Sequence, residues 1–376
     1  MPNILSGNKG EWSEVYAFFK LLSEGRLYAA DANLNKNESI FYDILKIVRK
    51  EEVGYLNFVF DTENSEIVVQ DNNGETKNKV STQDFATEAG ILLRAIASSN
   101  KASFEIVETS EFLDEILCKK IKAPSDDKSG ITIKVHDSIT GYQPTLGFSI
   151  KSRLGKPSTL LNAGANTNFI YQVVGNIGDV EMEHINNMFI EPIDDAVEGD
   201  RDISIKNRMK YLQDNGLKLK FFKMARDSFS NNLMLIDSHL PEIIAQLLLE
   251  YYVEGKSNLV DALKIVSTKN PMNYDLTQGH EFYEYKVKKL ITESALGMLP
   301  GRVWTGRAVA NGGYIIVRED GEVLCYHLYN RNDFEDYLLS NVRFERASAR
   351  RHGFGVIEKN GDNYFIKLNL QIRFIK

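Results

Sequence analysis

The stretch ITIKVHDSITGYQPTLGFSIKS, residues 131–152, decides the fold that we expect for this chain. Apolar and polar residues alternate from Ile131 to His136, and the same period-two pattern returns from Leu146 to Ser152, as is typical of β-strands. The segment TGYQP at residues 140–144, between the two runs, is rich in turn formers. The stretch therefore predicts an antiparallel β-hairpin.

Two side chains of this hairpin have the chemistry of phosphodiester cleavage. Asp137 ends the first strand and Lys151 lies on the second, so we expect the folded hairpin to bring them side by side. A carboxylate can hold Mg²⁺, which lowers the pKa of an attacking water, and a lysine can orient that water or stabilise the developing anion. The same pair also occurs in solvated hairpins, so a structural role stays open.

The position two residues before the lysine is the natural place for a second carboxylate, because side chains alternate with period two along a strand. Ser149 occupies it here and cannot supply the missing charge. Glu14 and Glu11, on a helix expected from Asn8 to Glu24, are the best replacements. Glu11 also suits a capping box with Asn8, and Glu14 also suits a solvated helix face.

Outside the hairpin the sequence predicts a mixture of helices and strands. Helical periodicity, helix-forming composition and capping residues indicate helices at 8–24, 40–50, 82–98, 182–189, 203–214 and 241–252. Strand patterns occur at 55–60, 66–69 and 168–174, and short ones follow from Tyr314, separated by turns such as Asp320-Gly321 and Asn360-Gly361. We expect an α/β (α+β) fold with three regions: residues 1–180 with the hairpin, a mainly helical 181–270, and a mixed, β-rich 271–376.

Bulk properties point to a reduced, cytoplasmic location. The two cysteines, Cys118 and Cys325, lie far apart, without the spacing of a zinc site or a disulfide framework. Residues 1–10 lack the basic and apolar regions of a signal peptide, and no window reaches the roughly 18 apolar residues of a membrane span. The formal net charge of −7 means that any surface for a polyanion must be local.

Two segments have the local chemistry of a DNA-binding surface. The first follows the lysine and is rich in hydrogen-bond donors: Ser152, Arg153, Lys156, Ser158, Thr159 and Asn162. The second concentrates positive charge near the C-terminus: Arg343, Arg346, Arg350, Arg351 and His352. Arginines that bind guanine would suit a G/C-rich target. An exposed polar loop and a basic turn are the structural alternatives.

Several stretches together resemble the HpaII-type restriction endonuclease family. They are GNKGEWSE at 7–14, LGFSIKSRLG at 146–155, PSTLLNA at 157–163, RHGFG at 351–355 and KLNLQIRF at 367–374. The resemblance spans nearly the whole chain. FSIKS alone is moderately specific, whereas all the segments in this order are considerably more so.

This resemblance implies a type II restriction endonuclease with a divergent PD-(D/E)XK nuclease core in residues 1–180. Such an enzyme uses Mg²⁺ to cut both strands of double-stranded DNA at a short palindrome, for which CCGG is the family's best-known sequence, and works beside a cognate cytosine methyltransferase. Asp137 and Glu14, or Glu11, would hold Mg²⁺, and Lys151 would position the water. A palindromic target favours a homodimer.

Two other functions remain open on the sequence. Ser149, in place of the expected acid, would suit a DNA-binding protein that has lost catalysis; DNA binding without metal and without cleavage would indicate it. A repair nuclease that recognises DNA structure would instead prefer branched or mismatched duplex to a palindrome.

Overall fold

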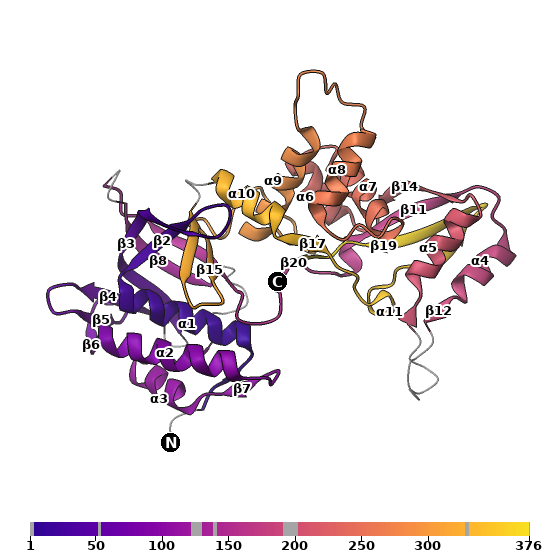
Figure 1. Cartoon of the computed structure of the whole chain (residues 1–376). Coiled ribbons are helices and arrows are strands. Elements are labelled where there is room, and N and C mark those ends of the chain that lie inside the picture. The colour runs from indigo at the N-terminus through magenta and orange to yellow at the C-terminus, as the bar shows by residue number, and fades with distance from the viewer. Residues whose placement is uncertain are drawn as a thin grey trace.

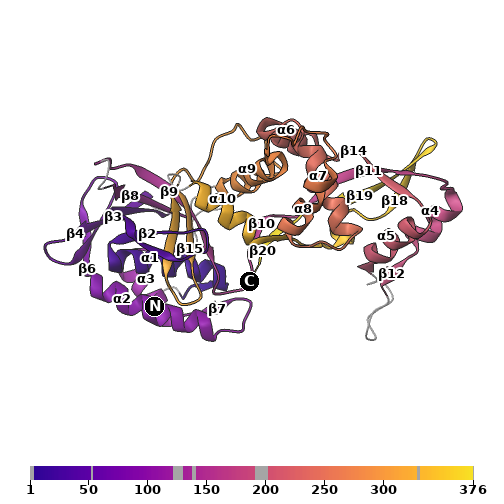
Figure 2. The same cartoon turned by 45° about the horizontal axis from the view of Figure 1, so that its top comes forward.

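A computed structural model describes residues 4–51, 54–121, 130–137, 141–190, 202–327 and 331–375. Its elements form two lobes, shown in Figure 1. The large-sheet lobe is built on a nine-stranded sheet, and the helical lobe contains most of the helices and three smaller sheets. Figure 2 shows α10 (Arg331–Ser340) and β20 (Ile372–Phe374) between the lobes. No helix in the described ranges is long and apolar enough to cross a membrane.

The nine-stranded sheet has the order β2-β16-β15-β9-β8-β3-β4-β5-β6. The β9–β15 and β16–β2 pairs are parallel and the other pairs are antiparallel, so the expected mixed, mainly antiparallel sheet is confirmed. The predicted hairpin is also confirmed as β8–β9. The strands are β2 (Arg26–Ala30), β3 (Lys36–Glu51), β4 (Gly54–Asp61), β5 (Glu66–Gln70), β6 (Thr76–Ser81), β8 (Ile131–His136), β9 (Thr145–Ser152), β15 (Gly313–Val317) and β16 (Val323–His327).

The helix predicted at 40–50 is wrong, because this segment lies inside the long strand β3. Its pairing with β8 shifts register between Ile44 and Lys46, and its pairing with β2 is irregular nearby. Such an irregularity moves the side-chain alternation by one residue. Ile44 and Ile47, three residues apart, are therefore both buried, which gives an apolar spacing that resembles a helix.

Helices α1 (Lys9–Glu24) and α2 (Thr82–Ser98) pack against the large sheet, α3 (Val107–Glu115) packs against these two helices, and all three share the hydrophobic cluster of the sheet. Phe18 of α1 meets Phe58 of β4 edge to face, with ring centroids 4.9 Å apart. The helices predicted at 8–24 and 82–98 are confirmed. Short strands β1 (Ser6–Gly7) and β7 (Phe104–Glu105) pair beside them.

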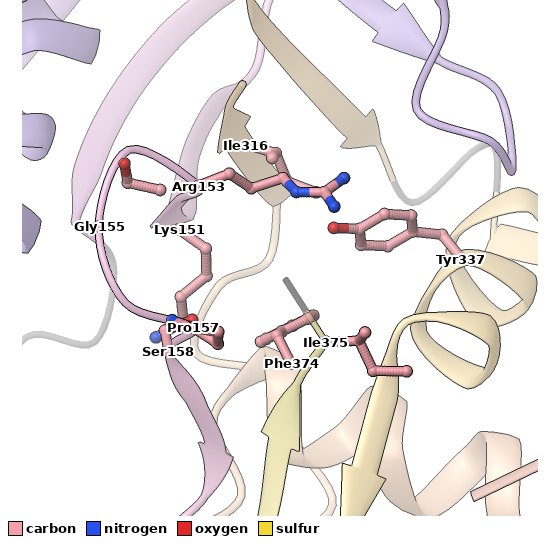
Figure 3. A pocket seen from close by; sticks show the side chains of 10 residues that line it. Lys151, Arg153, Gly155, Pro157, Ser158, Ile316, Tyr337, Phe374 and Ile375 are labelled. Atoms are coloured by element: carbon pink, nitrogen blue, oxygen red, sulfur yellow. The ribbon is translucent and has the colours of Figure 1, made fainter. Parts of the chain in front are cut away.

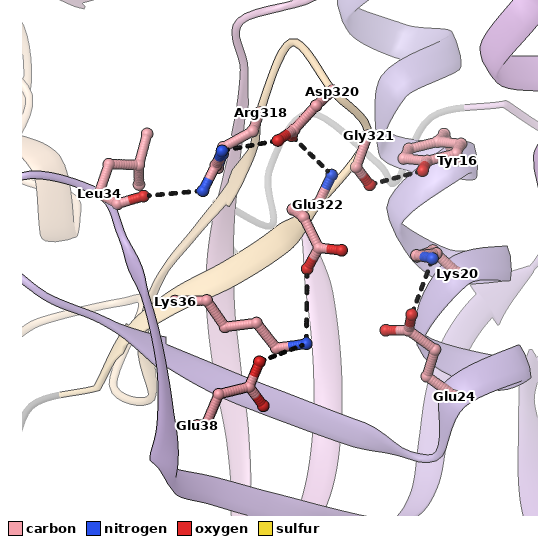
Figure 4. A network of polar contacts seen from close by, with 10 residues as sticks. All are labelled: Tyr16, Lys20, Glu24, Leu34, Lys36, Glu38, Arg318, Asp320, Gly321 and Glu322. Atoms are coloured by element: carbon pink, nitrogen blue, oxygen red, sulfur yellow. Dashed lines mark hydrogen bonds and ion pairs between the residues drawn. The ribbon is translucent and has the colours of Figure 1, made fainter.

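The turn between β15 and β16 attaches these late strands to the first helix (Figure 4). The Tyr16 hydroxyl on α1 donates a hydrogen bond to the Gly321 carbonyl at 2.6 Å. Asp320 accepts from the Glu322 amide at 3.1 Å and pairs with Arg318 at 2.6 Å. The predicted Asp320-Gly321 turn is thus confirmed, and it holds two distant parts of the chain together.

The helical lobe has its own hydrophobic cluster. Its sheets have the orders β14-β11-β19-β18 and β10-β20-β17, and β12 (Phe189–Ile190) pairs with β13 (Asp202–Ile203). The remaining strands are β10 (Thr159–Leu161), β11 (Asn168–Val174), β14 (Lys218–Met224), β17 (Val342–Phe344), β18 (Ile357–Asn360) and β19 (Asn363–Asn369). The helices are α4 (Asp179–Asn186), α5 (Ile205–Asp214), α6 (Asp227–Ile236), α7 (Leu240–Tyr252), α8 (Leu259–Lys269), α9 (Phe282–Leu296) and α11 (Ala349–His352).

The sequence predictions in this lobe are mostly confirmed. Helices predicted at 203–214 and 241–252 are α5 and α7, and the strand predicted at 168–174 is β11. The helix predicted at 182–189 begins and ends three residues earlier, because Phe189 belongs to β12. Asn360-Gly361 forms the β18–β19 hairpin turn as expected.

The two hydrophobic clusters each draw on both ends of the chain. Strands β15 and β16 lie in the large sheet, although they belong to the predicted region 271–376, and β11 of the predicted region 1–180 pairs with β14 and β19. Long-range pairing therefore crosses both predicted boundaries. The independence of regions 1–180, 181–270 and 271–376 as folding units stays a prediction.

Candidate active site and nucleic-acid interface

The register of the β8–β9 hairpin separates Asp137 from Lys151. Ile131 pairs with Phe148, and the Asp137 amide donates to the Tyr142 carbonyl at 3.0 Å. Lys151 lies nine residues further along the chain than Tyr142, or roughly 30 Å at about 3.3 Å per residue. The first residue of β8, Ile131, pairs with Phe148, so Lys151 extends beyond that end of β8, whereas Asp137 follows its other end. The expectation that the hairpin brings the two side chains side by side is therefore wrong.

Asp137 belongs instead to a buried group at the far end of the sheet. Its side chain is buried, as are those of Tyr42 on β3 and His327 on β16. The rings of Tyr42 and His327 are 4.8 Å apart, and the Asp137 carboxylate acts electrostatically on the imidazole. Burial lowers the pKa of His327 from 6.5 to about 4, and Asp137 opposes this shift in part. At neutral pH the imidazole is therefore neutral.

We expect His327 to make stability depend on pH. Because its pKa is lower in the folded chain than in the unfolded chain, it contributes stability that is present above about pH 6.5 and is lost as the pH falls towards 4. A pKa difference of this size corresponds to about 3 kcal/mol. Urea unfolding from pH 7.5 to 4.5 should show this loss in the wild type and a clearly smaller one in His327→Gln. Equal pH profiles for the two would contradict the assignment.

Lys151 lies beside a small cavity between the lobes, shown in Figure 3. Arg153 extends across this cavity towards the Tyr337 hydroxyl of α10, and its charge partly offsets the burial that raises the pKa of Tyr337 to about 12. Lys151 itself pairs with Ile316 of β15 in the parallel register. The cavity is lined by Lys151, Ser152, Arg153, Gly155, Pro157, Ser158, Ile316, Tyr337, Phe374 and Ile375.

Ser149 is buried on β9, opposite Tyr314 of β15. Its place two residues before Lys151 puts both side chains on one face of the strand. Phe148 and Ile150, on the other face, belong to the cluster under α1 and α2. Lys151 thus faces the helical lobe, as Ile316 beside it does.

The two glutamates of α1 have different surroundings. Glu11 completes the capping box: its carboxylate accepts from the Asn8 amide at 2.9 Å, while its own amide donates to the Asn8 side chain at 3.0 Å. Glu14 is half-buried and within electrostatic range of the Arg49 guanidinium on β3. Arg49 follows Val48, which pairs with Thr132 near the start of β8. Glu14 therefore lies towards the same end of the sheet as Lys151.

A complete metal site is not formed by the described residues, among which no group of three His, Cys, Asp or Glu side chains could hold an ion. Glu51, which is also at this end, is engaged by Arg49 at 2.8 Å and by the Lys119 amide at 3.1 Å. The sequence has Asp126 and Asp127 just upstream of β8, outside the described residues. Neither is among the predicted site residues, although a hairpin register aligned on Lys151 points to that side of β8.

The small sheet β10-β20-β17 brings the two predicted DNA-binding segments together. Thr159 pairs with Arg373, and Arg373 pairs with Arg343, so the three form one row across the sheet. Arg373 was missed as a candidate because it is isolated from the other arginines in sequence. Glu345 forms an ion pair with Arg373 and another with Arg343 at 3.5 Å. Arg343 is exposed, and Arg373 is partly exposed.

The other predicted contacts lie around this row. Ser158 accepts the Phe374 amide at 3.0 Å through its carbonyl, whereas Lys156 and Asn162 are exposed on either side of it. Ser152 caps the following turn by accepting the Leu154 amide. In the basic window, Arg346, Arg350 and Arg351 are exposed and His352 is half-buried, with α11 supplying the last three.

Comparison with known proteins gives two strong matches. A family model described as "HpaII restriction endonuclease" matches residues 8–374. The chain is 44% identical over 377 residues to the "Type II restriction enzyme HpaII" of Haemophilus parainfluenzae, and the alignment covers 100% of both chains. No solved structure matches the chain.

Proposed function

This chain belongs to the HpaII restriction endonuclease family and is a type II site-specific deoxyribonuclease acting on double-stranded DNA, and from this premise we propose which residues cut and which read the DNA. One observation carries the proposal: the cavity beside Lys151 is also lined by Ser158 and by Phe374, the neighbour of Arg373. The proposed cutting residue and the proposed reading sheet thus share one site.

The proposed nuclease core is of the PD-(D/E)XK type and lies in the large-sheet lobe. Antiparallel β3-β8-β9, the parallel neighbour β15 and the helices α1 and α2 support this assignment. Lys151 lies at the end of β9, where its flexible stem lets the ammonium group approach a phosphate from the helical-lobe side.

In the proposed mechanism the Lys151 ammonium donates a hydrogen bond to the attacking water or to a non-bridging phosphate oxygen. This bond strengthens as negative charge develops on the phosphorane, so it favours the transition state over bound DNA. Glu14, on the helix that covers the other face of the sheet, supplies a carboxylate at the same end of it. A divalent ion, Mg²⁺ in our proposal, would lower the pKa of the water and neutralise the phosphate when bound.

Glu11 and Asp137 are not part of this proposal. The Glu11 carboxylate caps its own helix, and Asp137 lies at the opposite end of the hairpin from Lys151. The remaining metal-binding carboxylate must come from another residue, and Asp126 and Asp127 are the sequence neighbours to test.

We assign DNA contacts to the row Thr159–Arg373–Arg343 and to the basic residues of α11. Arginine side chains present paired donors to guanine O6 and N7, which suits the proposed CCGG target. The palindrome, in turn, favours two copies of this site related by two-fold symmetry, which supports a homodimer. A cognate cytosine methyltransferase would protect the host's own sites.

Digestion of unmethylated plasmid DNA tests this function directly. With Mg²⁺ we expect discrete fragments whose sequenced ends share one short palindrome, and with EDTA we expect intact DNA. A plasmid treated with a CCGG-specific cytosine methyltransferase serves as the matched substrate. Metal-independent binding without cutting would instead support an inactive binding protein, and preferential cutting of branched duplex would support a structure-specific nuclease.

A further inference from the structure

The four-stranded sheet β14-β11-β19-β18 has one face turned away from the hydrophobic core. Tyr171, Val173 and Ile366 point into the core, and the Tyr171 hydroxyl donates to the Ala245 carbonyl of α7 at 2.8 Å. By the alternation of side chains, the residues between them point outward. Across the sheet these outward residues align in rows, Lys223 with Ile170 and Lys367, and then Lys220 with Gln172 and Phe365.

Positive charge dominates the outward face. Lys218, Lys220 and Lys223 of the edge strand β14 are exposed, and within the described part of the chain none of them forms an ion pair. One acidic residue, Glu358 of β18, pairs with Phe365 of this face. The Lys367 Nζ forms an ion pair with its Oε1 at 2.7 Å and so neutralises its charge. Against a formal net charge of −7, this concentration of lysines is a local exception.

Aromatic and amide side chains lie among the lysines. A register shift in β14 leaves Phe222 exposed, with its ring centroid 5.1 Å from that of Phe365. Gln172 donates to the Asn363 side chain at 2.8 Å. Lysines beside amides and an aromatic pair offer phosphate and sugar contacts rather than the large apolar area of a protein interface.

This face is continuous with the basic helix α11. The Asn168 side chain, at the start of β11, donates from Nδ2 to the His352 carbonyl at 2.9 Å, and the Gly355 backbone amide donates to the Lys367 carbonyl at 2.8 Å. Arg350 and Arg351 therefore lie at one end of the outward face, and Lys218, paired with Val174, lies at the other.

We infer that the outward face of β14-β11-β19-β18 binds the phosphate backbone of duplex DNA that flanks the cleavage site, with Lys218, Lys220 and Lys223 as the contacts. The inference rests on the DNA-reading role proposed for α11. From Asn168 to Val174, β11 extends about 20 Å, which equals roughly six base pairs of duplex. These contacts position the enzyme on DNA and carry no sequence preference.

The test compares wild type with Lys218→Gln/Lys220→Gln/Lys223→Gln on a 12-base-pair and a 40-base-pair duplex with one central site, with Ca²⁺ in place of Mg²⁺. On the long duplex we expect the triple variant to bind about 10- to 100-fold more weakly at low salt. The slope of log affinity against log salt should fall by as much as about 2.7 per protomer, or 0.9 for each lost contact. On the short duplex the variant and the wild type should bind alike.

A matched control removes the same charge elsewhere: Lys77→Gln/Lys79→Gln/Lys101→Gln, on the exposed surface of the large-sheet lobe. This control should bind both duplexes like wild type. An unchanged salt slope for the β14 variant on the long duplex, or an equal change in the control, would overturn the inference. Failure of the proposed function would look different, since wild type itself would then leave the duplex uncut when Mg²⁺ replaces Ca²⁺.

Discussion

Lys151→Ala is expected to slow DNA cleavage by roughly 100- to 1000-fold while DNA binding and folding change little. The magnitude is that of losing one well-placed donor to the developing negative charge. Stability should be retained because Lys151 is half-exposed at the end of β9 and the apolar residues of that strand, Phe148 and Ile150, stay in place.

Single-turnover cleavage at saturating enzyme measures this effect apart from binding. Lys156→Ala is the matched control. Lys156 is exposed on the next loop and does not line the cavity, so its replacement removes an equal charge outside the site. A Lys151→Ala enzyme that cuts within a few-fold of wild type would remove Lys151 from the catalytic group. A Lys151→Ala variant that no longer binds DNA would show that Lys151 holds the DNA in place rather than taking part in its cleavage.

Glu14→Gln should reduce cleavage by more than about 100-fold, since even outer partners of a metal typically contribute 10- to 100-fold. The amide keeps the size of the side chain but removes its charge. Glu11→Gln, one turn earlier, is the control: glutamine can still accept the Asn8 amide in the capping box, so the helix cap is kept and the cleavage rate should be unchanged.

A further set of carboxylate variants locates the second carboxylate that the proposed metal site needs. Asp126→Asn and Asp127→Asn are compared with Asp137→Asn, and each is assayed over a range of Mg²⁺ concentrations. Loss of cleavage that excess Mg²⁺ partly restores identifies a residue that holds the metal. For Asp137→Asn we expect lower stability with cleavage preserved. Complete loss of cleavage in a stably folded Asp137→Asn enzyme would contradict the separation that the hairpin register predicts.

Local patterns predicted the elements well but not their register. The hairpin, α1 and α2 follow from strict periodicity and caps, and their ends agree with the structure within a few residues. The alignment of Asp137 with Lys151 failed because a connection of several residues leaves the strand register open. That register depends on the Asp137–Tyr142 hydrogen bond and on packing against β3 and β15.

The site as a whole could be predicted only in part. Lys151, Glu14 and the arginine window were found from their residue types and from the family resemblance. Arg373 was not, because β20 pairs with β10, more than 200 positions earlier in the sequence, and with β17, about 30 positions earlier. Likewise, the helical spacing of Ile44 and Ile47 gave no sign that β3 is irregular.

The insertion of β15 and β16 between β9 and β2 has a consequence for synthesis in the cell. The ribosome makes the chain from its N-terminus at roughly 5 to 20 residues per second, so β9, with its lysine, emerges long before its parallel neighbour. Until Val317 has been made, β9 has an unpaired edge, and the arginines of β17 and β20 follow only at the very end. Interrupted translation therefore yields fragments without the full cutting and reading apparatus.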